Sequence, residues 1–204
     1  MKCMAEVINL FHTLTDLFEH ICTEVVTLNP AYYLVSVIIF AGFYLLGRKA
    51  FRFDRPLSVV NGLTAAYTYF VFAGTVLIRG GFTVFMPGTP GGAVAMEPFE
   101  SLKLALGGNS YYWRMIGINT LLILPFGFLS PFIYSEFMKA SARPRLYTFL
   151  LTALTSFLFT LTIELAQYIT STGVFELDDL IFNFLGAMIG FLVYLVFRKI
   201  FKNT

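Results

Sequence analysis

The sequence contains few charged residues: 14 Lys and Arg and 12 Asp and Glu, or 13 % of 204 residues. Soluble domains carry about 25 %. Apolar residues make up 57 % of the chain, and the mean hydropathy is +0.76. A chain with so few charges cannot give a soluble domain its usual polar surface, so the composition predicts an integral membrane protein.

Cysteine and histidine are scarcer still, with two residues of each. Cys3 and Cys22 lack the spacing of a metal site, and the two histidines, His12 and His20, also precede the first apolar segment. The apolar segments thus contain no Ser–His or Cys–His pair, which argues against covalent hydrolase chemistry. A net charge of +2 provides no continuous basic face, which argues against nucleic acid as a partner.

Long apolar segments dominate the rest of the chain. A helix needs about 20 apolar residues to cross the hydrocarbon core, and the segments are continuous rather than alternating, which predicts helices. The five predicted spans are residues 31–47, 57–79, 112–134, 146–169 and 178–197. We therefore expect an all-α, polytopic membrane protein with a five-helix domain over residues 30–204.

Two segments outside the predicted spans have distinctive sequence patterns. Residues 1–29 place apolar side chains at helical spacing with acidic residues opposite, which predicts an extracytoplasmic amphipathic helix packed on the protein. Residues 80–111 form the longest connection and include the Gly- and Pro-rich segment 86–92, so we expect a long outer loop. This loop is either a functional lid or a plain connector.

The basic residues indicate the orientation, because cytoplasmic loops retain positive charge. Ten of the fourteen follow the first, third or fifth span: Arg48, Lys49, Arg52, Arg55, Lys139, Arg143, Arg145, Arg198, Lys199 and Lys202. We therefore expect a protein of the cell membrane with its N-terminus outside and its C-terminus in the cytoplasm.

The fourth span contains an ionisable residue at a position where inserting a charge into the membrane costs free energy. A charged side chain at the centre of a membrane helix costs about 2.5–3.5 kcal/mol on insertion scales, which makes Glu164 a functional candidate. Gln167 lies on the same face as Thr152, Ser156 and Thr160. We expect Thr152 and Ser156 to bond carbonyls of their own helix, an explanation that Glu164 does not have.

The fifth span begins with two carboxylates. Helix capping would explain Asp178 or Asp179 but not Asn183, a full turn further on. Gly186 and Gly190 lie on the same face, and small residues at this spacing permit the close approach of another helix.

The third span contributes Arg114 and Asn119 near its start and two prolines, Pro125 and Pro131, that should bend it. Arg114 either extends outward to water or pairs with a carboxylate. Counted along the helices, the costly polar groups all fall in the outer half, so we expect one shallow ligand site open to the outer leaflet. Its predicted members are Arg114, Asn119, Glu164, Gln167, Asp178, Asp179 and Asn183. The cytoplasmic half has no comparable group, which argues against a transporter.

Three motifs that follow one another along the chain resemble those of a known protein family. Asn119 precedes Pro125 and Gly127, Glu164 precedes Gln167, and an Asp178–Asp179 pair precedes Asn183, Gly186 and Gly190. Together with Pro98–Phe99, this pattern resembles the VanZ-like membrane protein family. The resemblance implies a bacterial cell-envelope protein connected with resistance to glycopeptide antibiotics of the teicoplanin type. It does not imply an enzyme.

Two functions remain open at this point. The first is binding, without catalysis, of membrane lipid, a lipid-linked cell-wall precursor or the acyl-bearing part of the antibiotic. The second is an intramembrane enzyme for a lipid-linked or polyprenyl substrate, with Glu164 and Asp179 as acid and base. We expect no cofactor for the first, whereas the second could use a divalent metal such as Mg²⁺, which oxygen ligands suit.

Overall fold

The computed structural model describes residues 30–77 and 93–201 of the chain. The predicted amphipathic helix over residues 1–29, the two cysteines and the Gly- and Pro-rich segment 86–92 lie outside the described residues.

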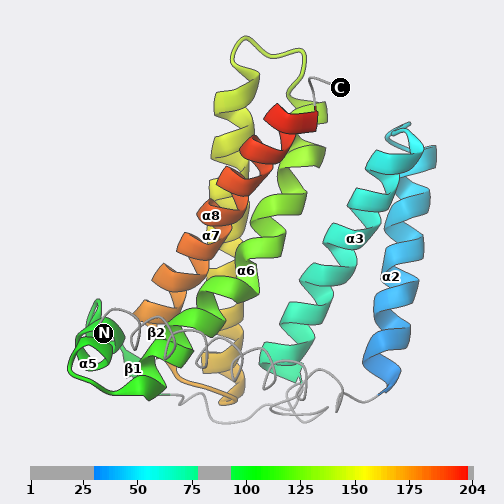
Figure 1. Ribbon diagram of the computed structural model, residues 1–204. Coiled ribbons are helices and arrows are strands. Elements are labelled where there is room, and N and C mark those ends of the chain that lie inside the picture. The colour runs from blue at the N-terminus through cyan, green and yellow to red at the C-terminus, as the bar shows by residue number, and fades with distance from the viewer. Residues whose placement is uncertain (1–29, 78–92, 202–204) are drawn as a thin grey trace, which may run out of the picture.

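Five long helices dominate the fold (Figure 1). They are α2 (Pro30–Lys49), α3 (Arg55–Phe72, extended by the π-helix η1, Ala73–Leu77), α6 (Ser110–Phe137), α7 (Pro144–Thr170) and α8 (Leu177–Phe201). Each is long and apolar enough to cross a membrane. The prediction of an all-α, multi-pass membrane protein with five spans is confirmed.

The sequence marks where several helices begin. Asp54 precedes α3, and its side chain accepts a hydrogen bond of 2.9 Å from the backbone N–H of Leu57. Asn109 precedes α6 and accepts one of 3.1 Å from Tyr111. Short Asp and Asn side chains satisfy the unpaired donors of a first helical turn in this way.

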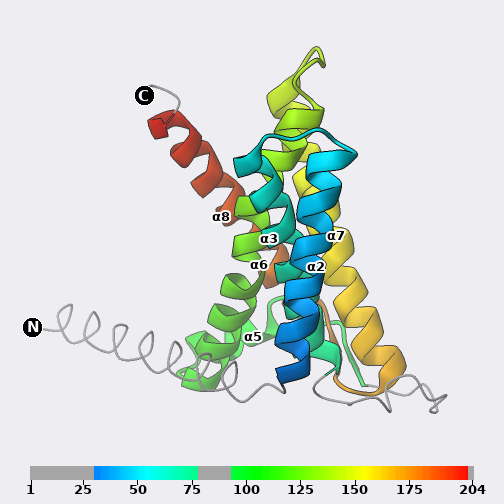
Figure 2. The ribbon, with the colours of Figure 1, turned by 90° about the vertical axis from the view of Figure 1, so that its right-hand side faces the viewer.

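The helices form two groups. α6, α7 and α8 pack together, while α2 and α3 form a hairpin that contacts this group through α3. Figure 1 shows the hairpin leaning away from α6 toward the end where α2 ends and α3 begins. Figure 2 shows α8 diverging from α7 toward its own C-terminal end.

The tightest contact in the bundle joins α6 to α8. A Cβ atom built on Gly186 would overlap the carbonyl oxygen of Thr120, and one on Gly190 would overlap that of Leu124. Gly127 of α6 meets the backbone of Ala187 in the same way. The close approach predicted from Gly186 and Gly190 is therefore confirmed, and the partner is α6.

α6 continues through both of its prolines. Pro125 has no N–H to donate to the preceding turn. The hydroxyl of Tyr67 on α3 donates to the carbonyl oxygen of Leu122 in that turn at 2.7 Å. A neighbouring helix thus supplies a donor beside the proline, as is usual within membranes.

The predicted loop 80–111 is partly wrong, because its described part, from residue 93 on, has regular structure. β1 (Val94–Ala95) pairs in parallel with β2 (Phe175–Glu176), and a short helix follows, α5 (Glu100–Leu106). α6 already begins at Ser110. This segment is folded because it pairs with the connection between α7 and α8, a partner that is distant in the sequence.

Candidate functional site

The predicted site residues lie where α7 ends and α6 and α8 begin, the end that also carries α5, β1 and β2 (Figure 1). There, the side chains of Glu164 and Asp178 hold β2 and α5 to the helices.

Glu164 anchors the strand before α8. Its side chain is 1 % exposed, and Oε2 accepts a hydrogen bond of 3.1 Å from the backbone N–H of Glu176 in β2. The carboxylate therefore joins α7 to the start of α8. Helix periodicity could place Glu164 on a buried face, but it could not identify a backbone N–H donor twelve residues away.

Asp178 anchors α5. The side chain is 3 % exposed, and its two oxygens accept hydrogen bonds from the backbone N–H groups of Phe99 at 2.5 Å and Ser101 at 2.7 Å. Phe99 has a left-handed backbone with φ of 61°, which costs a non-glycine residue of order 1–3 kcal/mol. Asp178 thus caps a helix, as one of the two aspartates was expected to do. The helix is α5 rather than its own.

Asp179 and Asn119 meet between α8 and α6, where the Nδ2 of Asn119 donates to Oδ1 of Asp179. Asn183, one turn further along α8, is 3 % exposed, and its Oδ1 has no hydrogen-bond partner among the described residues. Such an orphaned acceptor is uncommon, because buried polar atoms are nearly always paired.

Gln167 links α7 to the end of the second span. Its Nε2 donates to the carbonyl oxygen of Thr75 in η1 at 3.0 Å. Short π-helical turns are frequent at functional sites. Here the turn presents a backbone acceptor to α7.

Arg114 does not join this cluster. It is exposed in the first part of α6 and forms no ion pair with any residue that the structure describes. Of the two alternatives that the sequence left open, pairing with a carboxylate is not observed in the described part of the chain.

The polar stripe of α7 is buried along its length, and its members are Thr148, Thr152, Ser156, Thr160, Glu164 and Gln167. Thr152 donates to the carbonyl oxygen of Thr148 at 2.8 Å, as expected. The same expectation is wrong for Ser156, whose Oγ has no hydrogen-bond partner in the described part of the chain. Its carbonyl oxygen accepts instead from Thr160.

A divalent metal would need several hard ligands in one place. Within residues 30–77 and 93–201, no three His, Cys, Asp or Glu side chains gather closely enough to hold a metal ion. The contacts of Glu164, Asp178 and Asp179 described above are with backbone N–H groups and an amide.

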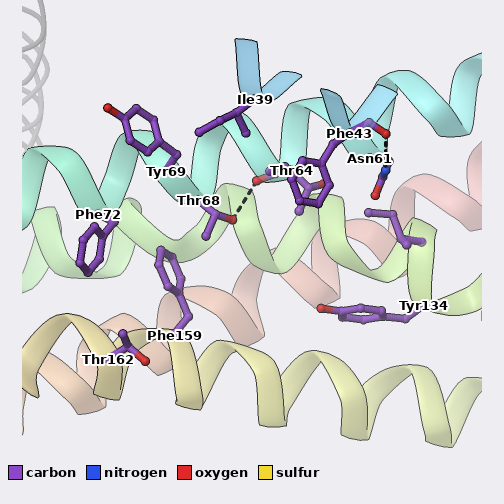
Figure 3. Close-up of a pocket in the computed structure, with 12 residues that line it drawn as sticks. Ile39, Phe43, Asn61, Thr64, Thr68, Tyr69, Phe72, Tyr134, Phe159 and Thr162 are labelled. Carbon is purple, nitrogen blue, oxygen red and sulfur yellow. Dashed lines mark hydrogen bonds between the residues drawn. The ribbon is translucent and has the colours of Figure 1, made fainter. Parts of the chain in front are cut away.

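The structure adds a feature that the sequence analysis missed. A groove of about 600 Å³ lies between the α2–α3 hairpin and the helices α6 and α7 (Figure 3). It follows α3 from Asn61 to Phe72, a helical length of about 16 Å. The other residues that line it are Ile39, Phe43, Thr64, Ala65, Thr68, Tyr69, Ile133, Tyr134, Phe159 and Thr162. None of these side chains carries a charge.

Most polar groups of the groove are already satisfied. Thr64 and Thr68 donate to carbonyls of their own helix at 2.8 Å, and Asn61 donates to the carbonyl oxygen of Phe43 at 2.7 Å. The hydroxyl of Tyr134 is 3.1 Å from that of Thr155. The groove therefore presents mainly methyl groups and rings. The recurrence of threonine at positions 64 and 68 of an apolar helix was the one available signal of a groove wall.

The comparisons agree with the motifs. No curated protein and no solved structure matches the chain. A family model described as VanZ/LLP1 matches residues 65–198, which include the C-terminal part of α3, all of α6 and α7 and most of α8. This region contains every predicted site residue and covers well over half of the sequence. The chain therefore belongs to the VanZ/LLP1 family.

Proposed function

We propose that this protein binds a lipid-linked ligand without catalysis, with the hydrocarbon chain of the ligand in the groove and its polar part at the end that carries Asn119, Asp179 and Asn183. The groove is the observation that carries the proposal, because it lies among membrane-spanning helices and has the length and chemistry of a hydrocarbon chain. Its volume of about 600 Å³ also falls in the range of small-molecule pockets, about 300–1,000 Å³.

The interior of the groove favours a hydrocarbon over water. A buried water needs two to four polar partners, and the hydroxyls and amide of the groove are mostly bonded within the protein. A hydrocarbon chain can contact the rings of Phe43, Tyr69 and Phe72 without breaking any of these hydrogen bonds.

The polar end contains a half-buried carboxylate, Asp179, and one turn further along α8 a buried amide oxygen, Oδ1 of Asn183. Asn183 lacks a donor for its Oδ1, and Asp179 is held in place by Asn119. The hydroxyl and amide groups of a saccharide or peptide supply such donors. A lipid-linked cell-wall precursor combines a head group of this kind with a hydrocarbon chain.

Membership of the family supports the cellular setting. We infer a role at the bacterial cell envelope in resistance to teicoplanin-type glycopeptides, with the polar end at the outer leaflet. The acyl-bearing part of the antibiotic is a second molecule with the same chemistry. The enzymatic alternative has less support, because the carboxylates of Glu164 and Asp179 both accept hydrogen bonds that hold structural elements together.

Filling the groove tests the proposal. Ala65 lines it, so Ala65→Trp should occupy the space of the chain and weaken binding of an undecaprenyl-linked saccharide by about tenfold or more, equivalent to about 1.4 kcal/mol. Binding is measured on purified protein in nanodiscs. Leu63→Trp is the control, since Leu63 is 45 % exposed on α3 and does not line the groove. Equal binding by wild type and Ala65→Trp would contradict a chain in the groove.

The orientation is tested separately. The described basic residues that predict it lie at the C-terminal ends of α2, α6 and α8 and the N-terminal ends of α3 and α7. With Cys3 and Cys22 replaced by serine, we expect Gly173→Cys to react with an impermeant maleimide on intact cells and Ala142→Cys to be protected. The reverse pattern would move the polar end to the cytoplasm.

A further inference from the structure

A second cavity lies at the opposite end of the molecule from the polar site. At this end α6 and α8 end and α7 begins (Figure 1). It has a volume of about 680 Å³. Four cationic side chains line it, namely Lys139, Arg145, Arg198 and Lys199. This concentration of one sign of charge distinguishes it from the groove beside α3.

The positive charge of this cavity is poorly balanced by the protein. Lys139 forms an ion pair with Glu136. Arg145 and Lys199 form no ion pair with a residue in the described ranges. Like charges in one hollow repel each other and raise the local concentration of anions. The cavity therefore favours an anionic occupant.

The remaining cationic residue, Arg198, is held in place by a buried aromatic side chain. Arg198 donates from Nη1 to the hydroxyl of Tyr194 at 2.7 Å, and its guanidinium carbon lies 5.9 Å from the ring centroid. Tyr194 is 1 % exposed and packs against Phe132 and Phe191, with ring centroids 4.8 and 5.9 Å away. The cation is thus partly preorganised, unlike an arginine that extends freely into water.

The walls of the cavity suit an amphiphile better than a free ion. Phe191 and Leu195 contribute apolar surface beside the cations, and the cavity lies between the ends of three membrane-spanning helices. Basic pockets between membrane helices hold anionic lipid head groups in this way, with the acyl chains along apolar side chains. A free phosphate would leave the apolar walls uncovered.

We propose that this cavity is a binding site for the head group of an anionic phospholipid. Lys139, Arg145, Arg198 and Lys199 surround the phosphate, and Phe191 and Leu195 contact the start of an acyl chain. The site is separate from the groove and the polar end, so it does not depend on the proposed function.

Lipid binding by purified full-length protein tests the site. Native mass spectrometry measures the affinity for dioleoyl-phosphatidylglycerol and, for comparison, dioleoyl-phosphatidylcholine. We expect wild type to prefer the anionic lipid and Arg145→Gln/Lys199→Gln to bind it about tenfold more weakly or worse, because each basic residue near an anionic surface contributes about 1 kcal/mol. Excess inorganic phosphate should not displace the lipid.

A matched control separates this cavity from general charge. Lys49→Gln/Arg143→Gln removes two cations from the same end of the molecule but outside the cavity, so it should bind like wild type. Arg145→Lys/Lys199→Arg preserves both charges and should also bind. Equal loss in both glutamine variants, no loss in either, failure of the charge-preserving variant or displacement by phosphate would each overturn the proposal.

Discussion

Replacing Gly186 by alanine is expected to force α6 and α8 apart and prevent the protein from accumulating in the membrane. The added Cβ would lie closer than 3.0 Å to the carbonyl oxygen of Thr120, which belongs to the backbone and cannot rotate away. Overpacking of this kind costs about 1–3 kcal/mol where side chains adjust, and more where backbone must move. Because α6 and α8 make the tightest contact of the bundle, we expect a loss above about 3 kcal/mol.

Membrane yield and the melting temperature of solubilised protein measure this loss. Gly42→Ala is the control, because a Cβ at Gly42 meets nothing within 4 Å on the exposed face of α2. It should accumulate normally. A Gly186→Ala variant that melts like wild type would show that α6 and α8 do not pack as described.

The second large effect is expected at Glu164, where Glu164→Gln and Glu164→Ala should behave differently. Glutamine retains an oxygen that can accept from the N–H of Glu176, so we expect its melting temperature to stay near that of wild type. Alanine removes the acceptor and leaves a buried cavity. The unsatisfied N–H alone costs about 1–3 kcal/mol, so the alanine variant should be clearly destabilised.

The charge of Glu164 should matter for function rather than for this joint. A neutral amide could hold the N–H of Glu176 without the desolvation cost of a carboxylate in a membrane helix. We therefore expect Glu164→Gln to fold and to lose resistance to a lipid-tailed glycopeptide. Unchanged resistance in the folded Glu164→Gln variant would reduce Glu164 to an anchor of β2.

The spans could be predicted because each depends on local composition. Residues 112–134 and 146–169 are predominantly apolar, and the structure extends them by only a few residues to α6 and α7. The contact at Gly186 and Gly190 was also visible, since two small residues at helical spacing admit only a close neighbour. The sequence did not identify α6 as that neighbour.

The roles of the two aspartates could not be separated by sequence. Asp178 and Asp179 are chemically alike, but successive residues point about 100° apart around a helix. Asp178 therefore reaches the backbone of Phe99 and Ser101, 79 and 77 residues away, while Asp179 faces Asn119. Backbone donors carry no sequence signal, so the anchor of α5 becomes visible only in three dimensions.

The groove was hidden for a related reason. Its walls come from four helices, and residues such as Ile39, Ala65 and Phe159 have the composition of any lipid-facing surface. Only the way in which the α2–α3 hairpin meets α6 and α7 leaves a space between them (Figure 3).

A structure determined with an undecaprenyl-linked saccharide bound in a nanodisc tests the central claim most directly. We predict elongated density along α3 between Asn61 and Phe72, with the saccharide at the end that carries Asn183. A groove closed by its own side chains while the ligand binds elsewhere, or a compact metal-like peak beside Glu164 and Asp179, would contradict the claim.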